Sequence, residues 1–170
     1  MLLLIYNLIL CVLLLLLSPV IFVWLLLRPK HAAGCLQKLT GQVIFSPQPE
    51  KKNRILFHAV SVGELMTARP LLDWLISQKN TQVIITSTTQ TGYDLGGKLF
   101  PNIQHYFLPY DLFFSIDQFL KTICPTHVFV METELWPNLA WLCKEKNIKL
   151  LLLNGRLSER SFKRYQLITS

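Results

Sequence analysis

The first 27 residues of the 170-residue chain contain no charged side chain. Leucine dominates this stretch, which is long enough to cross a hydrocarbon core of about 30 Å as one helix. Pro19 lies inside it, and membrane helices tolerate such a proline. A cleaved secretory signal would carry positive charge before the apolar stretch, whereas Arg28 and Lys30 follow it. We therefore expect residues 1–27 to form an uncleaved, single-pass transmembrane anchor.

Acidic residues are scarce immediately after this stretch. Residues 28–54 hold six lysines and arginines but a single acidic residue, Glu50. Basic residues beside a membrane span mark the cytoplasmic side and attract anionic lipid headgroups. We expect residues 28–53 to be a basic connector at the membrane surface and residues 54–170 to form a cytoplasmic domain. Little of the net charge of +7 lies after the connector, so no nucleic-acid partner is expected.

Several familiar motifs are also missing. The four cysteines form no C-x-x-C pair, so neither a zinc site nor a disulfide framework emerges. No G-x-G-x-x-G segment follows the first predicted strand, and no Walker A segment occurs. Ser61 does not lie in a G-x-S-x-G elbow. A dinucleotide-binding fold is therefore not supported.

From Arg54 onward, short apolar segments alternate with longer amphipathic ones. This alternation is typical of successive βα units and predicts an α/β domain with a Rossmann-like parallel sheet. The predicted strands are residues 55–62, 82–86, 103–108, 127–131 and 149–153. The predicted helices are residues 65–78, 92–99, 112–123, 138–146 and 158–168.

Every predicted strand ends in a polar or Gly/Pro-rich cluster on its C-terminal side. In a parallel sheet these ends share one edge, and ligands of open α/β sheets bind there. Glu64 follows the first strand and lies in the first turn of the next helix. The helix dipole alone favours a carboxylate there by about 0.3–1 kcal/mol, and βα turns are commonly polar. The pattern supports a lined cleft without identifying a reaction.

Four segments jointly resemble one family. They are residues 58–64 (HAVSVGE), 108–111 (LPYD), 131–138 (METELWPN) and 154–161 (NGRLSERS). In their order and spacing they resemble the 3-deoxy-D-manno-octulosonic acid (Kdo) transferases of lipid A biosynthesis. The chain departs from the usual family pattern at Gln90, where proline is usual, and at Gly155, where alanine is usual. Neither departure changes a carboxylate.

The resemblance implies an inverting glycosyltransferase of the GT-B type, in which two Rossmann-like domains face each other across a cleft. The N-terminal domain, preceded by the transmembrane helix, would take the lipid A precursor (lipid IVA). The C-terminal domain would take the donor, CMP-Kdo, and no cofactor or metal is expected. We expect residues 54–170 to be an incomplete acceptor-binding domain and the donor domain to be absent from this chain.

The resemblance also implies roles for individual residues. Glu64 matches the general base, which removes the proton of the acceptor hydroxyl. Glu132 matches a residue that stabilises the transition state, although a structural role beside the next helix is its alternative. The expected substrate-binding residues are Ser61, Gly63, Thr91, Gly92, Glu134, Arg156 and Arg160.

The remaining side chains that invite a functional interpretation have ordinary explanations. Arg156 and Arg160 suit bidentate pairing with the phosphates of the acceptor, or they lie on a solvated helix face. His58 lies within a strand and is expected to be a core histidine. Trp136 and Trp141 are expected to lie in the core.

A second function stays open at this point. The chain is then a truncated, catalytically inactive, membrane-anchored fragment that binds the acceptor. Coding sequence for a CMP-binding domain downstream of Ser170 would discriminate between the two functions.

Overall fold

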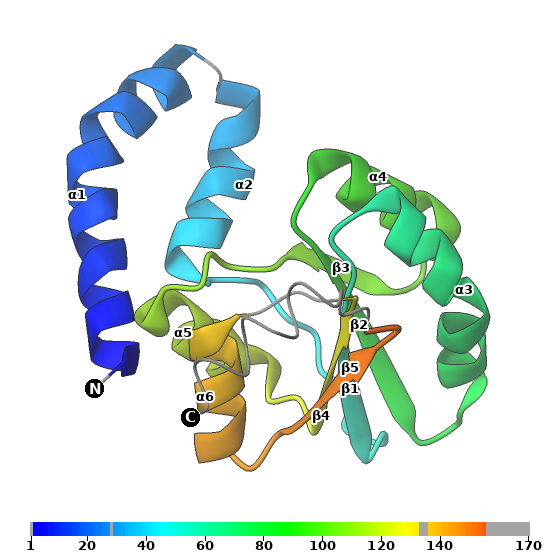
Figure 1. The fold of residues 1–170 in the computed structure, drawn as a ribbon. Coiled ribbons are helices and arrows are strands. Elements are labelled where there is room, and N and C mark those ends of the chain that lie inside the picture. Colours follow the sequence, from blue (N-terminus) through cyan, green and yellow to red (C-terminus); the bar gives the residue numbers. More distant parts are fainter. Residues whose placement is uncertain (1, 28, 133–135, 156–170) are drawn as a thin grey trace.

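The structure, a computed structural model, describes residues 2–27, 29–132 and 136–155 (Figure 1). Two N-terminal helices, α1 (Leu2–Leu27) and α2 (Pro29–Thr40), precede an alternating α/β domain. Its strands are β1 (Asn53–His58), β2 (Thr81–Ser87), β3 (Gln104–Phe107), β4 (His127–Met131) and β5 (Lys149–Leu153). Its helices are α3 (Val62–Ser77), α4 (Gln90–Leu99), α5 (Phe113–Ile123) and α6 (Pro137–Glu145).

The five strands form one parallel sheet in the order β3-β2-β1-β4-β5. The chain moves outward from β1 through β2 to β3, then returns to the other side of β1 with β4 and β5. Strand order therefore reverses between β1 and β4, whose residues His58 and Val130 are paired in register. In open α/β sheets a crevice forms at such a reversal, outside the carboxyl ends of the strands. The topology thus places the expected ligand site after β1 and β4.

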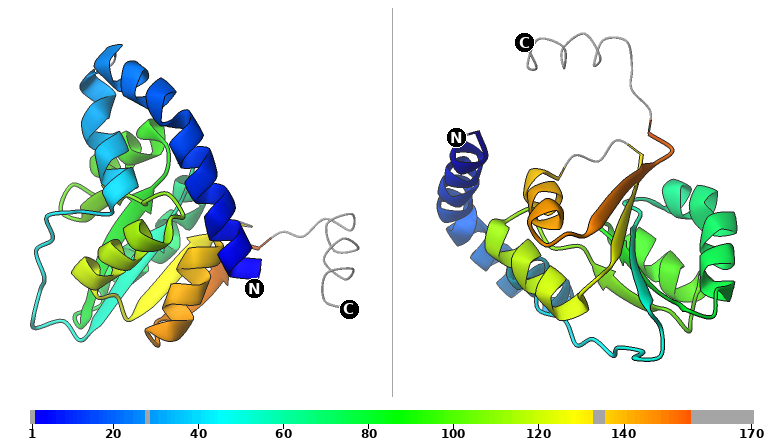
Figure 2. Two further views of the ribbon diagram at one scale, coloured as in Figure 1. Left: turned by 90° about the vertical axis from the view of Figure 1, so that its left-hand side faces the viewer. Right: turned by 90° about the horizontal axis from the view of Figure 1, so that it is seen from below.

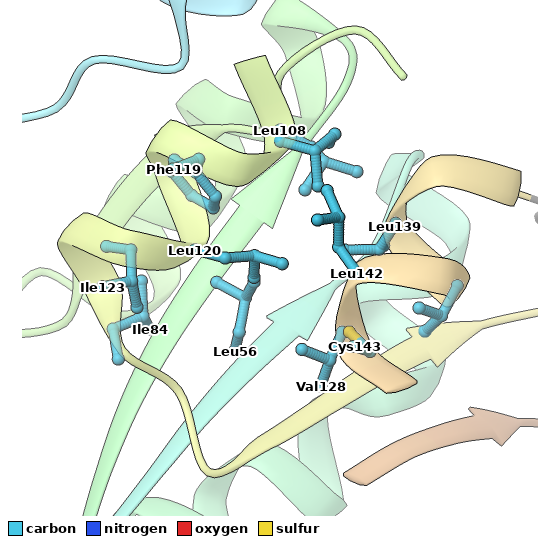
Figure 3. Close-up of a cluster of buried hydrophobic side chains, with 12 residues drawn as sticks. Leu56, Ile84, Leu108, Phe119, Leu120, Ile123, Val128, Leu139, Leu142 and Cys143 are labelled. Carbon is cyan, nitrogen blue, oxygen red and sulfur yellow. The ribbon is translucent and has the colours of Figure 1, made fainter. Parts of the chain in front are cut away.

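Helices cover both faces of the sheet, with α3 and α4 on one side and α5 and α6 on the other (Figure 1). The alternation of side chains along β1 supplies both cores, because successive residues of a strand point to opposite faces. Leu56 packs with Phe119 and Leu139 on the α5–α6 side (Figure 3). Phe57 packs with Leu65 on the α3–α4 side. Burial on both faces explains why the central residues of β1, β2 and β4 are apolar.

The predicted elements are confirmed wherever the structure describes them. Strands β4 and β5 have the predicted bounds, and the others differ by one to four residues at an end. The largest difference is at β1, which ends at His58 because Ser61 already caps α3. The predicted helix at residues 158–168 lies outside the described residues.

The basic connector contains a helix that sequence analysis did not predict. Helix α2 packs against the loop after β3, where the backbone N–H of Tyr110 donates to the carbonyl of Lys38 at 2.8 Å. The Ser115 hydroxyl of α5 donates to the carbonyl of Leu39. Gly34 allows this approach, since a Cβ there would lie 3.0 Å from the ring of Phe107. Contacts with the domain therefore stabilise a helix of 12 residues, a length at which an isolated helix is only marginally stable.

Helix α1 folds back along the domain on the same side of the sheet as α5 and α6 (Figure 1, Figure 2). The Tyr6 hydroxyl donates to Oδ2 of Asp111 at 3.0 Å. The side-chain amides of Asn7 and Asn138 donate to each other at 2.8 and 2.9 Å. By length and composition α1 is able to cross a membrane. Its first two turns nevertheless contact the domain, roughly 30 Å along the helix from Leu27.

Candidate active site

Glu64 lies in the first turn of α3, directly after the central strand β1. Ser61 caps this helix, and its hydroxyl accepts a hydrogen bond from the backbone N–H of Glu64 at 3.3 Å. The same hydroxyl donates to Oε1 of Glu64 at 3.0 Å, while the backbone N–H of Val60 donates to Oε2 at 2.8 Å. This arrangement resembles a capping box, in which the cap residue and the third helical residue bind reciprocally. The carboxylate is therefore fixed at the strand end, with 8% of the residue exposed.

The loop after β2 is fastened to the loop that carries Glu64. The Thr89 hydroxyl caps α4 by accepting from the N–H of Gly92 at 3.1 Å, and it donates to the carbonyl of Val60 at 3.0 Å. Gly92 is buried, and a Cβ there would lie only 3.1 Å from that carbonyl oxygen, so the close approach of the two loops favours glycine. Thr91 is exposed beside it and donates to the Thr89 hydroxyl at 3.4 Å. The two loops consequently form one unit.

Glu132 lies on the other side of the reversal in strand order, directly after β4. Its backbone adopts a left-handed conformation, with φ of 57°, which is uncommon for a residue other than glycine. Its N–H donates to the carbonyl of Leu153 at 2.8 Å, which continues the pairing of β4 with β5. Such strained residues cost about 1–3 kcal/mol and cluster at functional sites. The two carboxylates thus follow the two strands that flank the predicted crevice.

Six of the nine predicted site residues therefore lie at one edge of the sheet. Ser61, Gly63 and Glu64 follow β1, Thr91 and Gly92 follow β2, and Glu132 follows β4. The other three, Glu134, Arg156 and Arg160, lie outside the described residues.

Sequence analysis assigned no role to Asp111, although it quoted the segment that contains it. The carboxylate of Asp111 accepts hydrogen bonds from the backbone N–H groups of Asn138 and Leu139, each at 3.0 Å. It thereby caps α6 from a distant loop, since the cap residue Trp136 makes no side-chain cap bond. Burial raises the pKa of Asp111, while these N–H groups act to lower it. Asp111 thus fixes the end of the segment that begins at Glu132.

His58 and Trp136 lie beneath this edge on the α5–α6 side. His58 is fully buried, and its Nδ1 lies 3.1 Å from the hydroxyl of Thr86. Burial lowers the pKa of His58 to about 4, so its ring is neutral at pH 7. Its ring meets that of Trp136 edge-on at 6.0 Å. His58 and Trp136 pack in or against the core as expected, whereas the expectation for Trp141 is wrong, because it is 39% exposed.

A second residue that sequence analysis missed as a site residue is Lys38 of α2. Its ammonium donates to the carbonyl of Thr88 at 2.7 Å and lies 4.5 Å from the centre of the Phe107 ring. It lines a cavity of about 280 Å³ together with Thr89 and Tyr110. Burial lowers the pKa of Lys38. In sequence this lysine is only one of several basic residues in the connector, so no local pattern singles it out.

The described part of the chain offers no group of three His, Cys, Asp or Glu side chains placed to hold a metal ion. The chemistry that its geometry allows is proton transfer and electrostatic stabilisation by carboxylates.

Comparison with known proteins decides the family. The family model described as 3-deoxy-D-manno-octulosonic-acid transferase (kdotransferase) matches residues 37–170. The chain belongs to the Kdo transferase family. The 3-deoxy-D-manno-octulosonic acid transferase of Haemophilus influenzae is 42% identical over 113 residues, which are 65% of this chain and 26% of the relative. The match with the Kdo transferase of Bordetella pertussis is 29% identical over 157 residues, covering 86% of this chain and 36% of the relative.

The chain is also similar to a plant protein. The probable mitochondrial 3-deoxy-D-manno-octulosonic acid transferase of Arabidopsis thaliana is 36% identical over 141 residues, covering 76% of this chain and 32% of that protein. The chain thus spans between a quarter and about a third of the length of these curated relatives. All nine predicted site residues, and also Lys38 and Asp111, fall inside the family match, whereas α1 precedes it.

Proposed function

We propose that this chain forms the acceptor side of a glycosyltransferase that transfers Kdo from CMP-Kdo to the lipid A precursor, with Glu64 as general base. The observation that carries the proposal is the position of Glu64. Its carboxylate is fixed by Ser61 and Val60 at the carboxyl end of β1, beside the reversal in strand order. Each carboxylate oxygen accepts one hydrogen bond there and keeps a lone pair for a further donor.

The reaction needs a base because a sugar hydroxyl is a weak nucleophile. Glu64 takes the proton of the acceptor hydroxyl while its oxygen bonds to the anomeric carbon of Kdo. The bond from that carbon to the phosphate oxygen of CMP breaks, and its electron pair leaves with CMP. Attack opposite the leaving group inverts the anomeric centre. A positioned carboxylate contributes about 10²–10⁴-fold to such a step.

The other site residues take supporting roles in this proposal. Glu132, held in a left-handed conformation across the reversal from β1, stabilises positive charge that develops on the donor sugar. Ser61, Gly63, Thr91 and Gly92 form the wall on the acceptor side. Glu134, Arg156 and Arg160 complete the acceptor site. We expect transfer to need no metal, because CMP is a stabilised leaving group that protein donors can bind.

The same proposal includes the cellular location. Helix α1 anchors the chain at the inner membrane, and the basic residues that follow it hold the domain on the cytoplasmic side, where CMP-Kdo is present.

A chimera tests this function. The chain replaces the matching segment of the Haemophilus influenzae relative, and product from CMP-Kdo and lipid A precursor is measured by mass. The Glu64→Gln variant keeps the size and hydrogen bonding of the side chain but cannot take the proton. We expect it to lose about 10²–10⁴-fold in turnover. Glu145→Gln, at the exposed end of α6, is the matched control and should leave turnover unchanged.

Near-normal turnover of Glu64→Gln would reject Glu64 as the base and return it to a purely capping role. The 170-residue chain is assayed in parallel. Product formed by the chimera but not by the chain alone would show that transfer needs a donor domain in addition to these residues. Absence of product in both would instead favour the second function left open by the sequence, acceptor binding without transfer.

A further inference from the structure

An apolar groove of about 500 Å³ lies between α1 and the domain. We call it the α1 groove. One wall is a single face of α1, formed by Leu10, Leu14, Leu17 and Ile21, which recur at helical spacing. The opposite wall comes from Leu39 of α2 and from the loops after β3 and β4. The volume and the apolar lining are those of a ligand pocket, for which about 300–1,000 Å³ is usual.

The outer face of α1 indicates what surrounds this groove. Leu4, Leu8, Leu15 and Leu16 are between 66% and 76% exposed. Contiguous apolar surface of this extent marks a membrane or protein contact, and α1 has the length and composition of a membrane helix. When hydrocarbon covers this outer face, the groove on the inner face adjoins the bilayer. An acyl chain then enters the α1 groove directly from the hydrocarbon of the bilayer.

The far wall of the groove connects it to the candidate active site. Tyr110 and Leu112 follow β3, and Trp136 follows β4, so these residues belong to the same sheet edge as Glu64. Tyr110 and Cys35 also line the cavity of Lys38, so the two hollows adjoin. An apolar groove next to a cavity that holds an ammonium group matches an anionic lipid, with its chain in one and its charged head in the other.

We propose that the α1 groove holds one acyl chain of the glycolipid acceptor, and that Lys38 faces the anionic head group of the same molecule. This proposal rests on the proposed function, because that function supplies a lipid as the acceptor. It takes α1 in the position that this structure shows, held against the domain by Tyr6 and Asn7. Bound in this way, the lipid presents its sugar at the sheet edge that carries Glu64.

The test uses the full 170-residue chain in lipid nanodiscs. The probe is an acylated glucosamine phosphate with a photoreactive diazirine in one acyl chain, and the labelled positions are mapped by mass spectrometry. We expect label on the groove face of α1 and on Leu39 or Leu112. An excess of unlabelled glucosamine lipid should remove the label, whereas the same excess of phosphatidylglycerol should not. Removal by both lipids alike would assign the groove to bulk phospholipid and overturn the proposal.

Matched variants of α1 give a second readout. The Leu14→Trp/Leu17→Trp variant fills the groove and should lower labelling by about tenfold, equivalent to about 1.4 kcal/mol. The Leu15→Trp/Leu16→Trp control carries the same bulk on the outer face and should label like the wild type. Equal labelling of the two variants would overturn the proposal. Circular dichroism of both shows whether the groove variant is folded, and Lys38→Gln supplies an independent arm if it is not.

Lys38→Gln should weaken binding of the phosphorylated probe but leave a dephosphorylated probe unaffected. Loss of both, or of neither, would contradict the role of Lys38. Labelling requires neither CMP-Kdo nor transfer. A chimera that transfers Kdo while its groove stays unlabelled would therefore reject this inference and leave the proposed function standing. A labelled groove together with transfer that does not depend on Glu64 would support this inference and reject Glu64 as the base in the proposed function.

Discussion

The hydroxyl of Ser61 donates a hydrogen bond to the carboxylate of Glu64 and also caps the helix that carries this carboxylate. It accepts from the N–H of Glu64 at 3.3 Å and donates to Oε1 at 3.0 Å. One side chain thus serves both the start of α3 and the orientation of the proposed base. The helix-cap role and the catalytic role of Glu64 are therefore compatible, because the cap geometry fixes the carboxylate at the strand end.

Removing this hydroxyl should lower both stability and turnover. We expect Ser61→Ala to reduce the free energy of unfolding by about 1 kcal/mol, as is usual when an N-cap is lost. Turnover of the chimera should fall less than in Glu64→Gln, because the N–H of Val60 still holds Oε2. Ser61→Thr keeps the hydroxyl and should restore both quantities. Turnover of Ser61→Ala equal to the wild type would show that Ser61 does not position Glu64.

The sheet was predictable because its signals are local. Strands β1 and β4 lie at the centre of the sheet and are covered on both faces, so nearly continuous apolar segments identify them. The change from strand to helix is likewise indicated by residues close together in sequence, Ser61 and Glu64. These signals also placed Glu64 at the correct edge, since the ends of parallel strands meet there.

The contacts across the sequence were not predictable. Asp111 caps a helix that starts 26 residues later, and its own neighbours give no sign of that partner. Helix α2 forms because Phe107 and Ser115 pack against it, although Gly34 weakens its own helical preference. Lys38 enters the site only because α2 exists and lies against the loop of Tyr110. Tertiary packing therefore supplied what local patterns lacked.

The hydrogen bond from the Thr89 hydroxyl to the Val60 carbonyl braces the two site loops, and this brace depends on glycine at position 92. We expect Gly92→Ala to lower turnover of the chimera by about tenfold, because its Cβ would lie 3.0 Å from Oγ1 of Thr89 and 3.1 Å from the Val60 carbonyl. The loop that carries Glu64 must then move. Gly97→Ala, in the same helix, meets no atom within 4 Å. It should stabilise the protein by about 0.5–1 kcal/mol and leave turnover unchanged. Similar turnover in the two variants would show that the brace is not needed for positioning.

The cap that Asp111 provides to α6 should contribute measurably to stability. Asparagine offers one acceptor oxygen to two N–H groups, so Asp111→Asn leaves one buried donor without a partner. We expect the free energy of unfolding in detergent, measured with urea at pH 7, to fall by about 1–3 kcal/mol. Asp94→Asn, exposed on α4, is the control and should change it by less than about 0.5 kcal/mol. A change in Asp111→Asn no larger than the control would remove Asp111 as the cap of α6.

A buried histidine, His58, and a partly buried one, His105, should make the domain sensitive to acid. Burial lowers the pKa of both His58 and His105 to about 4, whereas an unfolded chain titrates near 6.5. Between these values the unfolded state binds more protons, so stability is fully present above about pH 6.5 and falls as pH falls toward 4. Each histidine contributes a slope of up to about 1.4 kcal/mol per pH unit in that window. Urea titrations at several pH values measure it.

His105→Gln separates this effect from general acid unfolding. Glutamine is neutral throughout the window. The pH dependence of the free energy of unfolding should therefore fall by the contribution of one histidine, while that of His58 stays. His127 is the control, since it lies partly exposed at the start of β4 and its pKa is lowered less deeply, by burial and by Lys149. His127→Gln should therefore change the slope less than His105→Gln does. An unchanged slope in His105→Gln would mean that this ring takes up its proton in the folded protein as readily as in the unfolded chain, with Nε2 donating a hydrogen bond to the Ser87 hydroxyl 3.0 Å away.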